Sequence, residues 1–63
     1  MSEHALSLVL VSLRTAENRI LDTHEAMAGG RWGEAWDAAA DGEQALIDAK
    51  RILGVLRDEE MSR

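Results

Sequence analysis

The chain has 63 residues, a net charge of −5 and neither cysteine nor proline. A chain of this length forms at most one domain and buries only about 60% of its unfolded surface. Chains this small usually need a disulfide, a metal or a partner subunit to become stable. The absence of cysteine excludes disulfides and thiolate metal sites, and the negative charge disfavours non-specific binding to nucleic acids and anionic membranes.

The first predicted helix spans about residues 3–28 and is followed by a turn over residues 29–31. Ser2 is the expected N-cap of this helix. Gly29 is expected to adopt the left-handed conformation that ends it. Its apolar and small residues follow a 3-4-3-4 spacing, which keeps them on one side of an α-helix. This stripe consists of Leu6, Val9, Leu13, Ala16, Ile20, Thr23 and Met27.

The second predicted helix spans about residues 32–57 and repeats the same spacing. Its stripe consists of Trp32, Ala35, Ala39, Gly42, Leu46, Ala49, Leu53 and Leu56. Three acidic residues follow Arg57 and are unfavourable at the negative end of a helix dipole, so we expect residues 58–63 to fray. The whole chain, residues 1–63, is therefore predicted to be a single all-α domain, an antiparallel two-helix hairpin.

The two stripes match in size when one helix is folded back on the other. In a hairpin that closes near residue 31, facing residues have numbers that sum to about 62, which sets Ile20 against Gly42 and Ala16 against Leu46. The missing Cβ atom of Gly42 would let the two backbones approach each other. We therefore predict that the two stripes form the seam between the helices.

This seam leaves a second set of apolar residues without a place in the hairpin. At 100° per residue they lie on the outer sides and flanks of the two helices. The set consists of Leu8, Val11, Trp36, Ala40, Ile47 and Val55. We predict that they form an interface, either with a second copy in a four-helix bundle or with a partner protein, the alternative being scattered surface hydrophobics. Trp36 is the preferred anchor because tryptophan is enriched in binding hot spots.

Two strips of charged or polar residues are further candidates for binding surfaces. For each, the alternative is a face that is simply solvated and binds nothing. An acidic strip on the second helix would suit a basic protein patch and comprises Glu34, Asp37, Asp41 and Asp48. A polar strip on the first helix contains Arg14 and Asn18 together with Glu25 and could contact RNA phosphates. Arg19 lies off this line and is a further candidate for the same contact.

The sequence contains no arrangement of residues that predicts catalysis or metal binding. The Glu-x-x-His signature of di-metal bundles is absent, and His24 is interpreted as a partly solvated residue at the edge of the seam. No phosphate-binding glycine loop and no Ser-His-acid arrangement can be assembled on a hairpin. We therefore expect a protein that is not an enzyme and has neither a metal nor a cofactor.

The length, the central turn and the layered seam resemble Rop-like regulators, in which a short helical hairpin dimerises into a four-helix bundle. The resemblance is one of architecture and covers nearly the whole chain. The RNA-contacting strip of that family combines lysine, polar residues and an aromatic residue, whereas the corresponding line in this chain holds Ser7, Val11, Arg14 and Asn18.

From these features we expect a small homodimeric regulator of the phage or plasmid type, an inhibitor, anti-activator or adaptor that binds a host or regulatory protein. The alternatives are a Rop-like RNA-binding regulator and a purely structural bundle subunit. No apolar run approaches the roughly 20 residues that span a bilayer, and the first residues lack the basic segment of a secretion signal. A cytoplasmic location without membrane contact is therefore expected.

Overall fold

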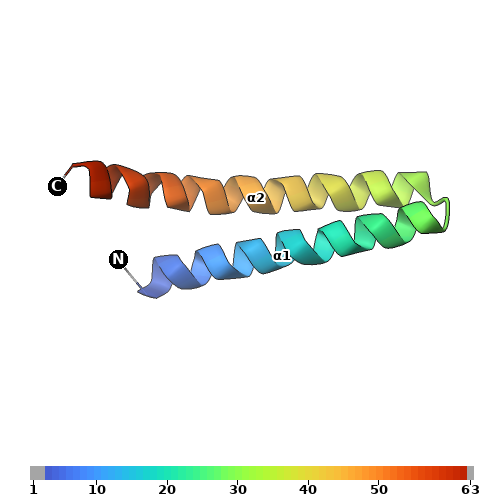
Figure 1. Cartoon of the computed structure of the whole chain (residues 1–63), viewed down its shortest axis with the longest axis horizontal. Helices are drawn as coiled ribbons and strands as arrows, with labels where there is room; N and C mark the ends of the chain where they lie inside the picture. Colours follow the sequence, from blue (N-terminus) through green and yellow to red (C-terminus); the bar gives the residue numbers. More distant parts are fainter. Residues whose placement is uncertain (1–2, 63) are drawn as a thin grey trace.

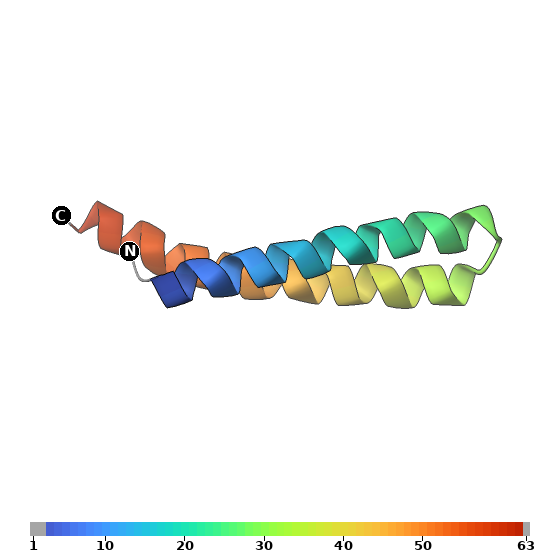
Figure 2. The ribbon, with the colours of Figure 1, turned by 90° about the horizontal axis from the view of Figure 1, so that it is seen from below.

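The computed structural model describes residues 3–62, so Ser2, the expected N-cap, lies outside the described residues. Two helices, α1 (Glu3–Ala28) and α2 (Trp32–Met61), run antiparallel and pack against each other along their length (Figure 1). The prediction of an all-α two-helix hairpin is confirmed. The molecule measures 50 × 17 × 11 Å and is a thin rod. The last turns of α2 project beyond the start of α1 (Figure 2).

The second helix is longer than expected. It continues to Met61, so residues 58–61, for which fraying was predicted, are helical. Its last turn is closed by Ser62, whose backbone N–H donates to the Asp58 carbonyl oxygen over 3.1 Å and whose hydroxyl donates to the Glu59 carbonyl oxygen over 3.0 Å. These bonds satisfy carbonyl groups that a helix end otherwise leaves unpaired. The repulsion between exposed acidic residues and the helix dipole is too weak to unwind the turn.

The turn between the helices is a Schellman motif. The backbone N–H of Arg31 donates to the Ala26 carbonyl oxygen over 2.8 Å, and that of Gly30 donates to the Met27 carbonyl oxygen over 3.0 Å. These two bonds require a left-handed residue at position 30, and Gly30 has a φ of +69°. The prediction that Gly29 adopts this conformation is therefore wrong by one residue.

The side chain of Arg31 holds the two helix ends together at this turn. Its guanidinium donates to the carbonyl oxygen of Glu25 over 3.4 Å and forms an ion pair with Glu34 over 2.9 Å. A cation at the C-terminus of α1 and an anion in the first turn of α2 both interact favourably with the helix dipoles.

Two glycine substitutions distinguish the left-handed turn position from a glycine within a helix. Gly30→Ala is expected to lower the free energy of unfolding by about 1–2 kcal/mol, because alanine is strained at positive φ. Gly54→Ala is expected to raise it by about 0.5–1 kcal/mol, because this glycine lies within α2 and a Cβ atom there meets nothing within 4 Å. Urea denaturation at one protein concentration measures both. Equal effects of the two variants would contradict the assignment of the turn.

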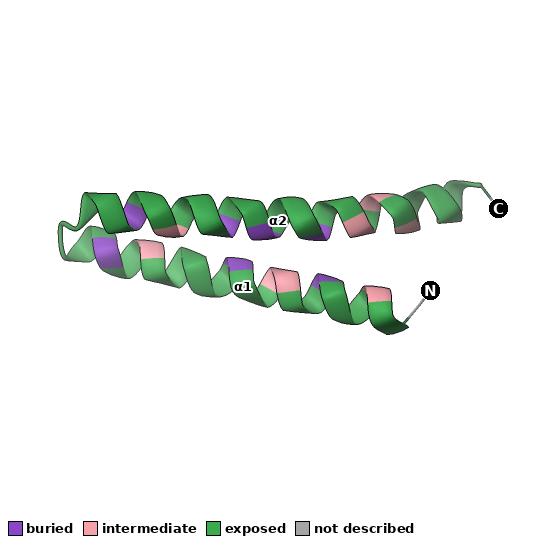
Figure 3. Ribbon diagram, turned by 180° about the vertical axis from the view of Figure 1, so that it is seen from behind, coloured by how far each residue is buried: buried purple, intermediate pink, exposed green. Residues whose placement is uncertain are grey.

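The seam between the helices is lined by small residues, and most of the large residues predicted to fill it lie beside it. The buried positions are Val9, Ala16, Ala26, Ala35, Gly42, Ala45 and Ala49, and they follow the facing sides of the two ribbons (Figure 3). Large residues of the predicted seam are 45–65% exposed, and these are Leu6, Ile20, Met27, Trp32, Leu46 and Leu53. The prediction is thus correct for the row that contains Val9 and Ala16 and wrong for the row of large residues.

Gly42 shows how closely the backbones approach. A Cβ atom added there would lie 3.3 Å from the Cβ atom of Arg19 and 3.7 Å from the carbonyl oxygen of Ala16. Gly42 therefore faces Arg19, not Ile20 as predicted. Seven residues before Arg19 on α1 and seven residues after Gly42 on α2, Ser12 faces Ala49. The residue numbers of each facing pair therefore sum to about 61. The predicted register was within one residue of this value.

Candidate protein-binding surfaces

One side of the hairpin carries two rows of mainly large apolar residues, which we call the groove face. In each row the residues are spaced seven apart. Each residue directly follows a seam position in the sequence, as Met27 follows Ala26 and Leu46 follows Ala45. The α1 row is Leu6, Leu13, Ile20 and Met27, and the α2 row is Trp32, Ala39, Leu46 and Leu53. An open groove of about 320 Å³ between the rows brings Ile20, Ala39 and Leu46 to the same side, with His24 and Glu43 also in its lining.

The large residues of the groove face are only half covered. Leu6, Ile20, Leu46 and Leu53 are each between 45% and 48% exposed. One side of each side chain is covered within the hairpin, and the other side meets solvent. Exposed clusters of large apolar residues are candidates for binding surfaces.

The opposite side of the hairpin is polar and lined by ion pairs in its half near the turn, and it carries Leu8 and Val55 toward the open end. Arg19 pairs with Asp22 over 3.0 Å and reaches across the seam to Asp41 over 4.0 Å. Arg31 and Glu34 form the ion pair already described at the turn. All of these groups are exposed, so each pair contributes little to stability, about 1 kcal/mol or less.

The predicted acidic strip is therefore largely engaged within the chain. Glu34 and Asp41 pair with arginines, and Asp48 accepts a hydrogen bond from the Gln44 amide over 3.1 Å. Asp37 is exposed. The two ion pairs offset part of the negative charge that a basic partner could use, whereas the hydrogen bond of Asp48 leaves its charge in place.

The three candidate RNA-contacting residues do not share one surface, and Arg19 lies apart from the other two, as its position off their line predicted. Arg19 lies at the seam, where Asp22 and Asp41 neutralise its charge. Arg14 instead lines a hollow on the outer side of α1 that also contains Glu17, and Asn18 is exposed. A more basic cluster, which was not predicted from the sequence, lines a groove along α2 and comprises Lys50, Arg51 and Arg57. The sequence feature that could have revealed this cluster is the occurrence of all three basic residues within eight positions.

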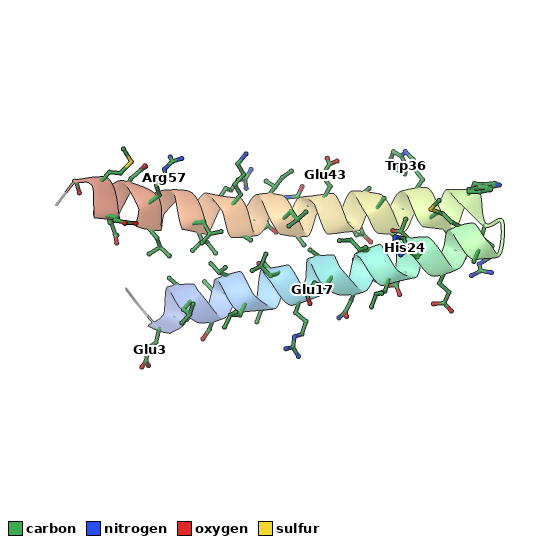
Figure 4. All side chains as sticks on the ribbon, in the orientation of Figure 1. Glu3, Glu17, His24, Trp36, Glu43 and Arg57 are labelled. Atoms are coloured by element: carbon green, nitrogen blue, oxygen red, sulfur yellow. The ribbon has the colours of Figure 1, made fainter. Side chains whose placement is uncertain are left out.

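The six predicted interface residues lie on three different surfaces. Leu8 and Val55, 44% and 58% exposed, belong to the seven-residue rows of Asp22 and Asp41 and so lie on the polar side. Val11, 64% exposed, lies on the outer side of α1. The remaining three run along the outer side of α2, and we call them the outer α2 stripe: Trp36, Ala40 and Ile47. Trp36 is 72% exposed and points away from α1 (Figure 4).

Metal binding and membrane insertion were each considered for the described part of the chain. Among residues 3–62 no three histidine or acidic side chains are grouped closely enough to hold a metal ion. Over the same residues, neither helix combines the length and apolar character required to cross a membrane. His24 lines the groove face beside Thr23, so its imidazole lies at the edge of an apolar surface.

Comparison of the chain with models of protein families, with curated proteins and with solved structures gives no match. The surfaces of the hairpin are therefore the basis for its functional interpretation.

Proposed function

We propose that this chain is a small dimeric regulator, an inhibitor, anti-activator or adaptor that acts by binding another protein. The observation that supports this proposal is the presence of two exposed apolar surfaces on different sides of one thin hairpin. The groove face would be covered by a second copy in a four-helix bundle, and the outer α2 stripe would remain available to a partner protein.

The accessible surface of the chain supports self-association. It is 5023 Å², whereas a compact monomer of 6.9 kDa has about 4,000 Å². Two chains together thus carry an excess of about 2,000 Å², which is the area that a stable protein–protein interface buries. The radius of gyration, 14.7 Å, also exceeds the value of about 11 Å that a compact domain of this length has.

The seam by itself is a poor source of stability. Apart from Val9, its buried hydrophobic residues are alanines, and no large side chain among the described residues is fully buried. Each buried methylene-sized group contributes only about 0.8 kcal/mol, whereas ordering each residue costs about 1–2 kcal/mol of backbone entropy. Covering the groove face would add the missing apolar burial.

The outer α2 stripe fits a helix of another protein. It is a narrow apolar line along one helix, and the small Ala40 between Trp36 and Ile47 allows a second backbone to approach closely. The residues beside this line are polar or charged, Asp37 and Gln44 among them, and would form the rim of the contact. Trp36 would be its anchor, because large aromatic side chains dominate the binding energy of such contacts.

Affinity purification from the source cells, followed by mass spectrometry, tests this proposal with matched variants. Ile47→Asp is expected to lose the captured protein because it places a charge in the stripe, while far-UV circular dichroism stays helical. Leu21→Asp is the control, since Leu21 is 64% exposed on the outer side of α1 and should retain the captured protein. Trp36→Ala should weaken capture at least ten-fold, as expected of a hot-spot residue.

Two outcomes would contradict the proposal. Equal loss of the captured protein with Ile47→Asp and Leu21→Asp would show that the stripe is not the binding surface. A dimer that captures no protein reproducibly would leave the chain a structural bundle subunit.

A further inference from the structure

We propose that two copies pack groove face to groove face with their turns at opposite ends, so that α2 lies antiparallel to α2 of the second copy. This inference rests on the dimer of the proposed function and adds its topology and register. Two arrangements are possible for hairpins stacked face to face about a two-fold axis. The alternative has both turns at the same end and sets α1 of each copy against α2 of the other.

The apolar row of α2 is self-complementary in the proposed arrangement. Because α2 runs from Trp32 to Met61, two antiparallel copies overlap over their full length only if they cross near Leu46. Leu46 then meets Leu46 of the second copy, and the small Ala39 meets the large Leu53. Alternation of large and small residues across facing positions is what close packing requires.

Charges beside this row favour the same arrangement. Glu43 and Lys50 lie on either side of Leu46, in the seven-residue row that begins at Trp36 and separates the groove face from Ala40 and Ile47. When two copies of α2 cross at Leu46, Glu43 of each copy lies opposite Lys50 of the other. A symmetric dimer contains this contact twice, and each of the two pairs joins opposite charges.

The alternative arrangement brings like charges together twice, whereas the proposed one brings Glu17 near Glu17 of the second copy only once. Glu17 and Glu43 lie at the same level along the rod, on α1 and α2 respectively (Figure 4). With both turns at one end, Glu17 of each copy would face Glu43 of the other, which is repulsive and again occurs twice. Only Glu3 and Arg57, at the open end of the rod, would form an attractive pair.

A single engineered cysteine tests the topology, because the natural chain has none. Leu46→Cys is expected to form a disulfide-linked dimer by itself under mild oxidation, since the two sulfur atoms would meet at the two-fold axis. Leu13→Cys mixed with Leu46→Cys should give no more of the linked heterodimer than chance. Efficient heterodimer formation, with no Leu46→Cys homodimer, would overturn the inference in favour of turns at the same end.

Charge exchange provides a second readout that leaves the apolar rows intact. Glu43→Lys and Lys50→Glu are each expected to weaken dimerisation about ten-fold at low salt, and the double variant should restore it. If the turns lay at the same end, Glu43→Lys would instead strengthen the dimer by removing the repulsion from Glu17. The sign of this one change therefore decides between the two arrangements.

The two proposals can fail separately. A natural chain that stays monomeric in sedimentation equilibrium would contradict the dimer itself. A natural chain that dimerises, combined with a Glu43→Lys variant that dimerises more tightly, would keep the dimer and contradict only its topology.

Discussion

Leu46→Asp is expected to abolish dimerisation and, with it, most of the helical structure at micromolar concentration. Leu46 is 48% exposed in the hairpin and lies at the middle of the groove face. In the dimer its exposed half would be covered, so the change loses about 1 kcal/mol of apolar burial per chain at the interface and places a carboxylate in an apolar contact, which costs roughly 2 kcal/mol or more per chain. Counted over two chains, the loss reaches about 6 kcal/mol, which corresponds to more than a thousand-fold weaker dimer.

The neighbouring residue supplies the matched control for this experiment. Ile47→Asp introduces the same charge one position along α2, on the outer side of the helix, and should leave a helical dimer. Leu21→Asp introduces the same charge on the outer side of α1 and should also leave a helical dimer. Sedimentation velocity and far-UV circular dichroism of the three variants measure the effect. A Leu46→Asp protein that remains a helical dimer would show that the groove face is not the interface.

Ala49→Leu is expected to be the most destabilising change within the seam. Ala49 is 1% exposed, and counting in seven-residue steps from Gly42 and Arg19 places it opposite Ser12 in the seam. The added carbon atoms would push the helices apart, at a cost of about 2–3 kcal/mol. For a chain of this size that corresponds to a fall of about 10–20 °C in the melting temperature.

Ala40→Leu is the control for overpacking, because Ala40 is exposed on the outer side of α2. It adds the same atoms without forcing the helices apart, so its melting temperature should stay within about 3 °C of the natural value. Thermal denaturation at equal protein concentration compares the two variants. If Ala49→Leu were tolerated as well as Ala40→Leu, the assignment of a close-packed seam of small residues would be wrong.

Local signals in the sequence were sufficient to predict the hairpin. The spacing of apolar residues indicated two helices, and two adjacent glycines indicated the turn between them. The register followed from the length of each arm and was within one residue of the structure. The assignment of the left-handed position to Gly29 failed because it depends on hydrogen bonds from positions 30 and 31, which the composition of the turn does not determine.

The rotation of each helix about its own axis could not be predicted in the same way. In both helices the predicted stripe contains one row that faces the seam, with Val9 in α1 and Gly42 in α2, and a second row that faces the groove. The structure places Ala26 and Ala45 in the seam, next to the more hydrophobic Met27 and Leu46. Close approach of the helices selects small side chains, and these give a weak signal in a hydropathy pattern.

The same error in helix rotation explains why the predicted interface residues do not form one surface. Leu8 and Val11 were selected because they lie opposite a stripe of which only one row faces the seam, so the predicted surface omitted the exposed row of Ile20 and Leu46. In the proposed dimer the predicted stripe becomes the core of a four-helix bundle, because its two rows would face the seam and the second copy together. Only the outer α2 stripe, with Trp36, is retained as a candidate for partner binding.

Sedimentation equilibrium of the natural chain tests most directly whether a second copy covers the groove face. If it does, the protein should have twice its chain mass of 6.9 kDa at concentrations where it is helical, and dilution should lower its melting temperature. A helical species of 6.9 kDa that persists at several hundred micromolar, with a melting temperature independent of concentration, would contradict the dimer.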